Sequence, residues 1–171
     1  LIHHMPKSTV LMGVPTFYVR LLADKGFNKK VARNMRLFIS GSAPLLTETF
    51  NTFKKVIGQP ILERYGMSET VMLVSNPYKG ARVGGSVGLP LPGVKVRVVD
   101  DKNKPCGVNE IGSIQVKGPN IFKGYWRMPE KTAEEFTNDG WFKTGDVGRW
   151  GGEANGGKAP NDYLCIVGRS K

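Results

Sequence analysis

The sequence predicts an α/β fold, namely the end of a parallel α/β layer followed by a small antiparallel β sheet or barrel. In the first 80 residues, apolar runs alternate with helical patterns in the order strand, helix, strand, which is typical of a parallel sheet. After Asn76-Pro77 the sequence changes to short alternating runs separated by turns rich in Gly, Pro and Asn, which is typical of antiparallel strands. We therefore expect two parts, residues 1–80 and residues 81–171.

The first part opens with a short apolar run over residues 9–14, which Pro15 ends. Thr16 is a candidate N-cap for the helix that follows. Four apolar residues at helical spacing define the buried face of this helix: Phe17, Tyr18, Leu21 and Leu22. Residues 25–34 are polar and predict a loop or a short helix.

A second strand and a second helix follow in the same part. Residues 35–40 are apolar enough for a buried strand, and Gly41-Ser42-Ala43-Pro44 follows it. Residues 47–57 place Phe50, Phe53 and Ile57 at helical spacing, and Gly58 ends the helix. The next strand begins at residues 60–63.

The second part contains short strands and one helix. Residues 82–93 hold four glycines and two prolines. Four alternating or apolar runs predict strands: residues 94–99, residues 111–116, a run that ends at Phe142-Lys143, and residues 163–167. Residues 129–138 favour one short helix, and the glycine-rich stretch from Gly151 to Asn161 is typical of a flexible hairpin tip.

The composition is that of an ordinary globular protein. Of the 171 residues, 40% are hydrophobic and 23% are charged, and no stretch approaches the roughly 18 apolar residues of a membrane span. The formal charge of +11 would suit a nucleic-acid or membrane-surface partner, but Lys and Arg are scattered and occur in pairs at most. We therefore expect a solvated basic surface, with no nucleic-acid partner and no membrane span.

The two cysteines and the chain ends say little about chemistry. Cys106 and Cys165 are far apart and fit no metal or redox spacing, so we expect free thiols rather than a disulfide. The first and last residues do not resemble a natural start or end, and the sequence stops directly after an apolar run. We therefore expect that N-terminal and C-terminal parts of the same chain are missing.

The most informative segment runs from Glu63 to Glu69, with the sequence Glu-Arg-Tyr-Gly-Met-Ser-Glu. We expect it to leave a buried strand and to turn at Gly66, because glycine adopts backbone angles that other residues resist. An aromatic ring, a hydroxyl and a carboxylate beyond a strand's carboxyl end could hold a Mg-nucleotide. The alternative is a hairpin turn with a solvated glutamate.

Four ordered segments point to a family. They are Gly41-Ser42-Ala43-Pro44, Tyr65-Gly66-Met67-Ser68-Glu69, Thr144-Gly145-Asp146 and Gly168-Arg169. In this order and spacing the chain resembles the adenylate-forming superfamily, which includes acyl-CoA synthetases. The runs Gly85 to Gly93 and Phe122 to Trp126 are also similar to this superfamily, so that the resemblance covers nearly the whole chain.

The resemblance implies roles for the second segment. Tyr65 would stack on the adenine, next to Gly66, and the Ser68 hydroxyl would contact the α-phosphate. Glu69 would ligate Mg²⁺, which prefers oxygen ligands. Ser68 and Glu69 are thus the catalytic candidates.

Further nucleotide contacts come from the other segments. Gly41, Ser42 and Ala43 would allow a close approach of the backbone to the adenine and acyl groups. Asp146 would accept hydrogen bonds from both ribose hydroxyls, although a turn aspartate is the alternative. Arg169 would also contact the ribose, although alone it would be a surface charge.

The resemblance also implies what the chain lacks. Lys171 matches the hinge to the carboxy-terminal domain, so a phosphate-binding loop would lie upstream and a catalytic lysine downstream. The isolated fragment would be inactive. A cytoplasmic location is expected and a mitochondrial one is the alternative, since any targeting peptide would lie in the missing segment.

The sequence around Arg64 resembles the malonyl-CoA synthetases within the superfamily. The guanidinium of Arg64 could pair bidentately with the distal carboxylate of a dicarboxylic acid, with Ser42 and Met72 beside the acyl group. The alternatives are a structural salt bridge of Arg64 with Glu63 or Glu69, and a core role for Met72.

The expected reaction is an AMP-forming ligation. A carboxylic acid, ATP and coenzyme A would be the small-molecule partners, with malonate or methylmalonate as the acid and Mg²⁺ as the metal. A ligase for a short monocarboxylate and a non-catalytic nucleotide-binding fragment are the alternatives.

Overall fold

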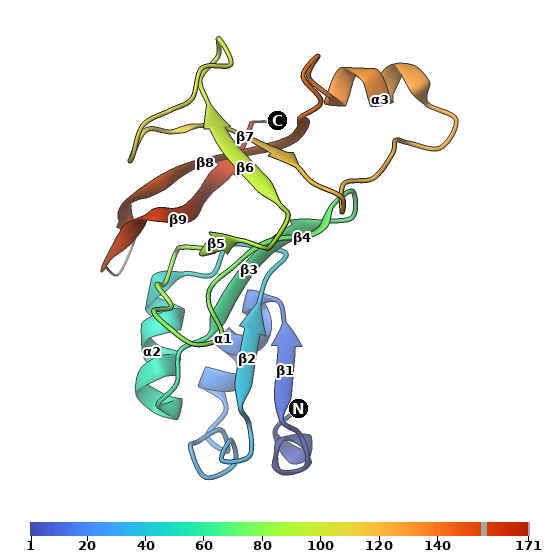
Figure 1. Cartoon of the computed structure of the whole chain (residues 1–171). Coiled ribbons are helices and arrows are strands. Elements are labelled where there is room, and N and C mark those ends of the chain that lie inside the picture. Colours follow the sequence, from blue (N-terminus) through green and yellow to red (C-terminus); the bar gives the residue numbers. More distant parts are fainter. Residues whose placement is uncertain (155–156, 171) are drawn as a thin grey trace.

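The computed structural model describes residues 1–154 and 157–170 (Figure 1). It confirms the mixed α/β class, with one sheet that contains parallel strands and a second, antiparallel sheet. In chain order the elements are η1 (Ile2–Lys7), β1 (Val10–Gly13), α1 (Pro15–Ala23), β2 (Leu37–Ser40), α2 (Thr47–Ile57), β3 (Leu62–Met67), β4 (Val71–Ser75), β5 (Leu89–Pro90), β6 (Lys95–Val99), β7 (Gly112–Lys117), α3 (Pro129–Glu135), β8 (Phe142–Ala154) and β9 (Gly157–Arg169).

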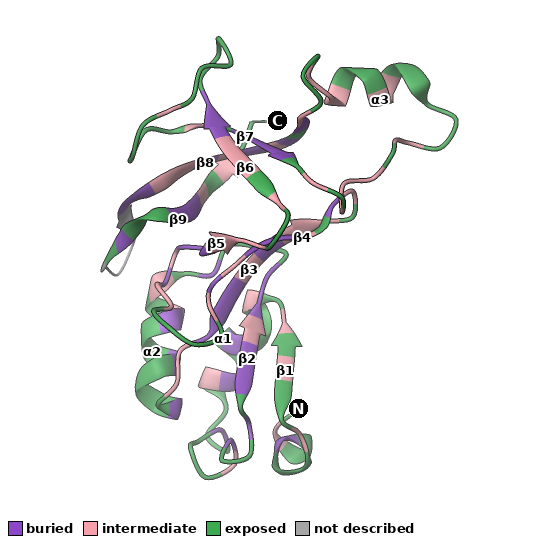
Figure 2. Ribbon diagram, viewed as in Figure 1, coloured by how far each residue is buried: buried purple, intermediate pink, exposed green. Residues whose placement is uncertain are grey.

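The first sheet has the strand order β1-β2-β3-β4-β5. The strands β1, β2 and β3 are parallel, whereas β4 and β5 pair antiparallel to their neighbours. Helices α1 and α2 pack against this sheet through an aromatic cluster, in which Tyr18 and Phe38 contact Phe53 edge to face. These three side chains are fully buried and supply the apolar contact that holds the helices on the sheet. Figure 2 shows that β2 is mostly buried, whereas α2 is exposed over part of its surface.

The two helices test the predicted helix boundaries. Helix α2 spans Thr47–Ile57 and is stopped by Gly58, as predicted; the φ of Gly58 is +87°, a left-handed value. Helix α1 begins two residues earlier than predicted, because its N-cap is Val14 rather than Thr16 and Pro15 occupies its first turn. The prediction that Thr16 caps this helix is therefore wrong. The fixed φ of proline favours the first helical position, so Pro15 starts the helix instead of only ending the strand before it.

The hairpin of β3 and β4 corrects the prediction of a turn at Gly66. Gly66 lies inside β3, at a β-bulge between Tyr65 and Gly66, and the turn comes three residues later. A Cβ atom at Gly66 would lie only 1.9 Å from the Val71 carbonyl oxygen. The glycine is needed for the close approach of the two strands rather than for a left-handed backbone.

The second sheet has the order β6-β7-β8-β9 and is antiparallel throughout. Its core includes Val98, Ile114, Val116, Phe142 and Leu164, each at most 1% exposed. Strand β8 begins at Phe142, so the prediction that a strand ends there is wrong. This strand continues into a long hairpin with β9.

Two further predictions fall in this half of the chain. Helix α3 occupies Pro129–Glu135, inside the predicted range 129–138. The predicted tip from Gly151 to Asn161 includes the ends of β8 and β9, and its residues 155 and 156 lie outside the described residues.

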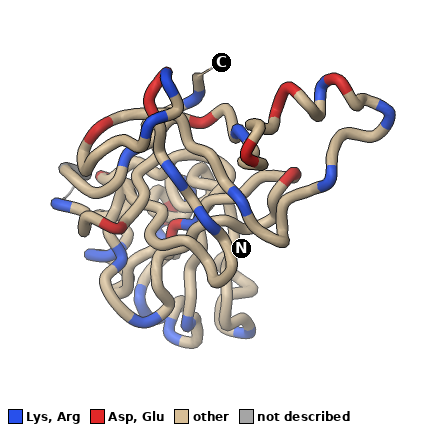
Figure 3. The backbone as a smooth tube through the Cα atoms, turned by 45° about the horizontal axis from the view of Figure 1, so that its top comes forward, with Lys and Arg blue, Asp and Glu red and all other residues tan. Residues whose placement is uncertain are grey.

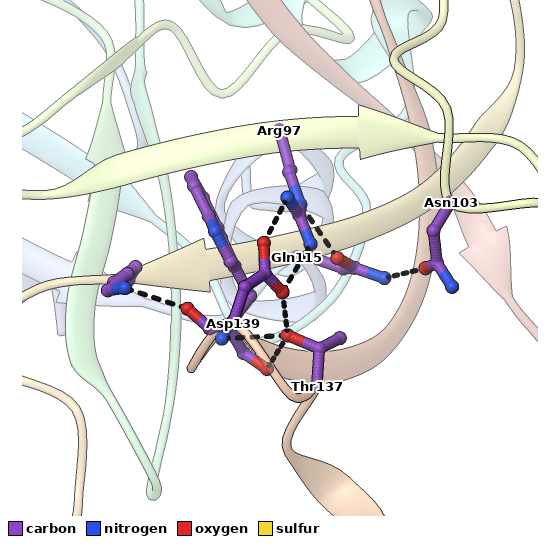
Figure 4. Close-up of polar contacts among 7 residues, drawn as sticks. Arg97, Asn103, Gln115, Thr137 and Asp139 are labelled. Carbon is purple, nitrogen blue, oxygen red and sulfur yellow. Dashed lines mark hydrogen bonds and ion pairs between the residues drawn. The ribbon is translucent and has the colours of Figure 1, made fainter.

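A polar network fastens the loop before β8 to the second sheet (Figure 4). Arg97 donates two hydrogen bonds to the Asp139 carboxylate, at 2.9 and 3.2 Å, and a third to Gln115 at 2.8 Å. Gln115 in turn donates to Asn103, and Thr137 donates to Asp139. Gln115 is buried, so its amide depends on Arg97 and Asn103 for its hydrogen bonds.

Lys and Arg are scattered along the chain and do not form one continuous stretch, as Figure 3 shows. Cys106 and Cys165 are free thiols, as predicted. Among the described residues, no helix is long and apolar enough to cross a membrane.

Candidate functional site

A cavity of about 520 Å³ lies where the carboxyl ends of β2 and β3 meet the second sheet. Its walls come from the start of α2, from β3, and from β8 and β9. Seven of the predicted site residues line it: Ser42, Ala43, Arg64, Tyr65, Gly66, Asp146 and Arg169. The fold therefore brings together segments that lie more than 100 residues apart in the sequence.

The segment after β2 allows a close approach of neighbouring groups. Ser42 has a φ of +66°, a left-handed backbone conformation that residues other than glycine rarely adopt. Gly41 does not line the cavity itself, but a Cβ atom there would lie 2.7 Å from the Arg64 Cζ. Glycine at this position thus makes room for the guanidinium of Arg64.

The Arg64 side chain has no acidic partner among the described residues. Its Nη2 atom lies 3.9 Å from the Met12 sulfur, and its buried Nε atom has no hydrogen-bond partner. Neither Glu63 nor Glu69 forms an ion pair with it, so the structural salt bridge considered as an alternative is not formed in the described structure. An unpaired guanidinium at a cavity wall favours an anionic ligand.

Glu63 is a buried carboxyl group that sequence reasoning considered only as a partner for Arg64. It is 6% exposed, lines the cavity, and accepts a hydrogen bond from the Gly85 N–H at 3.0 Å. Burial raises the pKa of Glu63 to about 8, against the smaller opposing effect of the Gly85 bond. The group is therefore largely protonated near neutral pH. A charged residue in an otherwise buried strand is the signal that could have found it.

Asn76 holds the glycine-rich segment that forms the adjacent cavity wall. Its buried amide donates to the Ser86 carbonyl oxygen at 2.5 Å and to the Glu63 carbonyl oxygen at 3.2 Å. The Ser86 hydroxyl donates to the Leu164 carbonyl oxygen at 2.9 Å, which joins this segment to β9. These bonds fix the position of Gly85 and hence of its contact with Glu63.

Tyr65, Asp146 and Arg169 form a chain of polar contacts across the cavity. The Tyr65 hydroxyl donates to Asp146 Oδ2, and Arg169 Nε lies 3.5 Å from Asp146 Oδ1. Burial, reinforced by the Asp146 carboxylate, raises the pKa of Tyr65 far above its ordinary value. Ser170 donates two hydrogen bonds to the Gly145 carbonyl oxygen, at 2.9 and 3.0 Å, and thus anchors the segment with Arg169 beside Asp146.

Ser68 and Glu69 lie at the turn between β3 and β4, outside the walls of the cavity. The Glu69 carboxylate accepts a hydrogen bond from the Tyr125 hydroxyl at 3.0 Å, and the Glu69 carbonyl oxygen accepts one from the Phe122 N–H. Burial and the Glu69 carboxylate raise the pKa of Tyr125. The motif from Phe122 to Trp126 therefore positions Glu69.

The described residues contain no group of three or more His, Cys, Asp or Glu that could hold a metal ion. A lone glutamate still fits Mg²⁺, because this ion keeps several waters and is often held by one carboxylate and substrate phosphates. Glu69, with one oxygen bonded to Tyr125 and the other without a described hydrogen bond, is compatible with that arrangement.

Met72 does not line the larger cavity. It lines a second cavity of about 480 Å³, together with Met12, Leu62 and Leu91. Arg64 lines both cavities and so connects them. Lys171, the predicted hinge, lies outside the described residues.

The family model described as "AMP-binding enzyme" matches residues 3–126, which is more than half of the chain. The chain belongs to this family. Among the AMP-binding enzymes, a malonate–CoA ligase of Arabidopsis thaliana is 46% identical over 170 residues, which is 95% of this chain and 26% of that protein. A mitochondrial malonate–CoA ligase of Mus musculus is 39% identical over 83% of this chain and 30% of that protein.

Solved structures of AMP-binding enzymes show the same architecture. The ATP-bound crystal structure of MatB from Rhodopseudomonas palustris matches with a TM-score of 0.92 and 52% identity, over 99% of this chain and 32% of that chain. A malonyl-CoA ligase with methylmalonyl-CoA and AMP bound matches with a TM-score of 0.84 and 37% identity, over 99% and 35%. The predicted resemblance to malonyl-CoA synthetases is confirmed, and this chain spans about a third or less of the length of these relatives.

Proposed function

We propose that the chain is part of an ATP-dependent, AMP-forming ligase that joins malonate or methylmalonate to coenzyme A. The observation that carries this proposal is the unpaired Arg64 guanidinium beside Gly41, at the wall that the two cavities share. Support comes from the relatives, because proteins named as malonate–CoA ligases are 39–46% identical to this chain. A fatty-acid pocket would instead be lined by apolar side chains, since burying an unpaired guanidinium is costly.

In this proposal, the nucleotide occupies the larger cavity. Asp146 accepts hydrogen bonds from the ribose hydroxyls, and Arg169 contacts the same sugar. The Tyr65 ring stacks on the adenine near Gly66, and the backbone at Gly41 to Ala43 approaches the base and the acyl group. The relatives with ATP or AMP bound support a nucleotide at this site.

The acid is held by its distal carboxylate. Arg64 presents a planar fork of N–H donors that matches a carboxylate bidentately. Ser42 lies next to this group, and Met72 contacts the carbon between the two carboxylates from the second cavity. One methyl group changes affinity by only about 1–3 kcal/mol in an apolar pocket, so both malonate and methylmalonate are proposed substrates.

The chemistry then needs positioning and charge neutralisation. A carboxylate oxygen of the acid attacks the α-phosphorus of ATP, and pyrophosphate leaves. The coenzyme A thiol then attacks the carbonyl carbon of the acyl-adenylate, the thiol proton is lost, and AMP leaves. Mg²⁺, held by Glu69, would neutralise phosphate charge. The Ser68 hydroxyl donates to the α-phosphate, and Arg64 keeps the acid aligned.

The proposed enzyme needs more than this chain supplies. We propose that Lys171 is the hinge to a further domain, that residues 1–80 and 81–171 belong to two subdomains, and that the isolated chain is inactive. We also propose a cytoplasmic location with a mitochondrial one as the alternative, which the name of the Mus musculus relative supports.

The test is pyrophosphate release by the full-length parent protein with Mg-ATP and coenzyme A, comparing malonate, methylmalonate, acetate and octanoate. Release with the dicarboxylates alone is the expected result. Release with acetate would favour a ligase for a short monocarboxylate, and would assign Arg64 a structural role. No release with any acid would overturn the ligase proposal and leave a nucleotide-binding fragment.

A further inference from the structure

The turn between β3 and β4, which carries Glu69, is held by a segment from the second half of the chain. The Asn120 amide donates hydrogen bonds to the Thr70 and Met72 carbonyl oxygens, at 2.7 and 3.0 Å. The Phe122 N–H donates to the Glu69 carbonyl oxygen at 2.8 Å. The backbone of the turn is therefore fixed from outside its own hairpin.

The turn needs this support because its backbone is strained. Val71 has a φ of +56°, a left-handed value that a β-branched residue rarely adopts. Such a conformation persists only where the surrounding contacts fix it, and it is concentrated at functional sites. The two bonds from Asn120 supply such contacts, because they reach the residues directly before and after Val71.

The Glu69 carboxylate is held by a donor that does not cancel its charge. The Tyr125 hydroxyl donates to it at 3.0 Å, and among the described residues Glu69 forms no ion pair. The lysine of α3, Lys131, pairs with Glu134 and Glu135 of its own helix. A half-buried carboxylate that is oriented but not neutralised keeps its attraction for a cation.

Two other carboxylates show the same distinction within this fold. Asp139, which does not line the cavity, is paired bidentately with Arg97, so its charge is balanced inside the protein. Asp146, which lines the cavity, accepts a hydrogen bond from the neutral Tyr65 hydroxyl and faces the largely exposed Arg169 at 3.5 Å. The carboxylate of the β3–β4 turn thus shares a tyrosine donor with the carboxylate at the cavity wall.

Tyr125 is itself fixed by α3 and by an aromatic neighbour. Its N–H donates to the Thr132 hydroxyl at 2.9 Å, and this hydroxyl donates to the Met128 carbonyl oxygen at 2.8 Å. A Cβ atom at Gly124 would lie 2.6 Å from Thr132 Cγ2, so glycine allows the loop to approach the helix this closely. The Tyr125 ring also contacts Phe122 edge to face. Both the backbone and the ring of Tyr125 are therefore held in place.

We propose that Tyr125 is a positioning residue for Glu69, and that residues 120–135 thereby set the affinity of the site for Mg²⁺. This inference rests on the proposed function, since it presumes that Glu69 ligates Mg²⁺ beside bound ATP. The Tyr125 hydroxyl bonds Glu69 Oε1 and leaves Oε2, which no described residue bonds, for the ion. Without the hydroxyl the carboxylate would have to be ordered when the ion binds, which weakens binding.

The experiment measures by calorimetry the affinity of the full-length parent protein for ATP, first in EDTA and then with excess Mg²⁺. The ratio of the two affinities reports the contribution of the metal to ATP binding. Tyr125→Phe, which keeps the ring, should lower this ratio about 3- to 10-fold, the size expected from one hydrogen bond, and leave the affinity in EDTA unchanged. Tyr163→Phe is the matched control, since it loses a hydroxyl bond to the Ala81 carbonyl oxygen and should change neither affinity.

A double substitution tests whether Tyr125 acts through Glu69. Glu69→Ala should lower the ratio further than Tyr125→Phe, and Tyr125→Phe in the Glu69→Ala background should lower it no more. Thr132→Val removes the hydroxyl that holds Tyr125 and keeps the shape of the side chain, so it should lower the ratio by a smaller factor. Thermal unfolding shows which variants fold, and Thr132→Val carries the test if Tyr125→Phe does not fold.

Three results would overturn the positioning role. They are a ratio that Tyr125→Phe leaves unchanged, a loss of affinity that is equal in EDTA and in Mg²⁺, and a further loss in the Glu69→Ala background. A Glu69→Ala ratio equal to that of the wild-type protein would remove the metal ligand and overturn the inference with it. All these results leave pyrophosphate release by the wild-type protein with malonate intact, whereas failure of the proposed function abolishes that release.

Discussion

The Tyr65 hydroxyl donates a hydrogen bond to the Asp146 carboxylate, although the two residues are 81 positions apart and belong to different sheets. Strand β3 of the first sheet is thereby joined to β8 of the second at the wall of the cavity. The same carboxylate faces Arg169 with its other oxygen. Its orientation is therefore set from both sides before any ligand arrives, which reduces the ordering cost of binding.

Replacing Tyr65 by phenylalanine removes this bond and keeps the ring. We expect the free energy of unfolding to fall by about 1–3 kcal/mol, because a hydrogen bond to a charged group is lost. For the full-length parent protein we also expect a higher KM for ATP and an unchanged KM for malonate. Denaturant unfolding and steady-state kinetics measure the two effects. Tyr163→Phe also loses a hydrogen bond, the partly buried one to the Ala81 carbonyl oxygen, and should lower stability without changing the KM for ATP.

The raised pKa of Glu63 makes the stability of the protein depend on pH. Burial raises its pKa from the ordinary value of 4.5 to about 8, so the folded chain binds more protons than the unfolded chain between these values. The contribution of Glu63 to stability therefore decreases as pH rises from 4.5 to 8, by at most about 1.4 kcal/mol per pH unit, and is constant above 8. Glu63→Gln should flatten this part of the curve. Urea unfolding of both proteins across this range is the measurement, and an unchanged slope would contradict the assignment.

We expect substitutions of Arg64 to reduce activity with the carboxylic acid selectively. Arg64→Ala should lower kcat/KM for malonate by about 10- to 100-fold, which corresponds to a lost hydrogen bond between charged groups, and should change ATP affinity little. Arg64→Lys should recover only part of the loss, because an ammonium cannot form the bidentate pair. Arg36→Ala removes an exposed arginine as the control. Equal losses for malonate and ATP would make Arg64 a structural residue.

We expect substitution of Arg97, which lies away from the cavity, to lower the stability of the fold. Besides its bonds to Asp139 and Gln115, its guanidinium lies 4.4 Å from the centre of the Trp141 ring. Arg97→Ala should destabilise the protein by about 1–3 kcal/mol, because the buried Gln115 loses a partner. Lys131→Ala, which removes ion pairs within α3, should have a much smaller effect. Thermal unfolding separates these outcomes, and similar losses for both variants would contradict the expectation.

The sequence predicted those features that depend on local signals. Helix α2 carries its buried face at helical spacing and ends at a left-handed Gly58, so its bounds agree with the prediction. Helix α1 carried two competing local signals, a proline and a threonine. The proline decided the start, because its φ is fixed before the helix forms.

Features set by pairing between strands could not be predicted in the same way. Gly66 looks like a turn residue, yet the bulge opposite β4 decides its role. The start of β8 at Phe142 depends on its register with β7, which the sequence of either strand alone does not state.

The site was predicted in part. The ordered motifs and the resemblance around Arg64 together named seven residues that line the cavity, but not Ser40 or Glu63 as cavity residues. A hydroxyl at the end of a buried strand carries no sequence signal, and its lack of a partner is visible only once the neighbouring strands are placed. Burial also decides that Glu63 holds its proton, and burial is a property of the fold.

The two hydrogen bonds from Ser170 to the Gly145 carbonyl oxygen have a mechanical consequence. Tension on the chain beyond Ser170 would act first on the turn that carries Asp146, and then on the pairing of β8 with β9. In the proposed ligase, displacement of a domain beyond the hinge would thus be transmitted to the bound nucleotide through the Gly145 carbonyl group. Ser170→Pro, which removes both donors, would uncouple that movement from the proposed contact of Asp146 with the ribose.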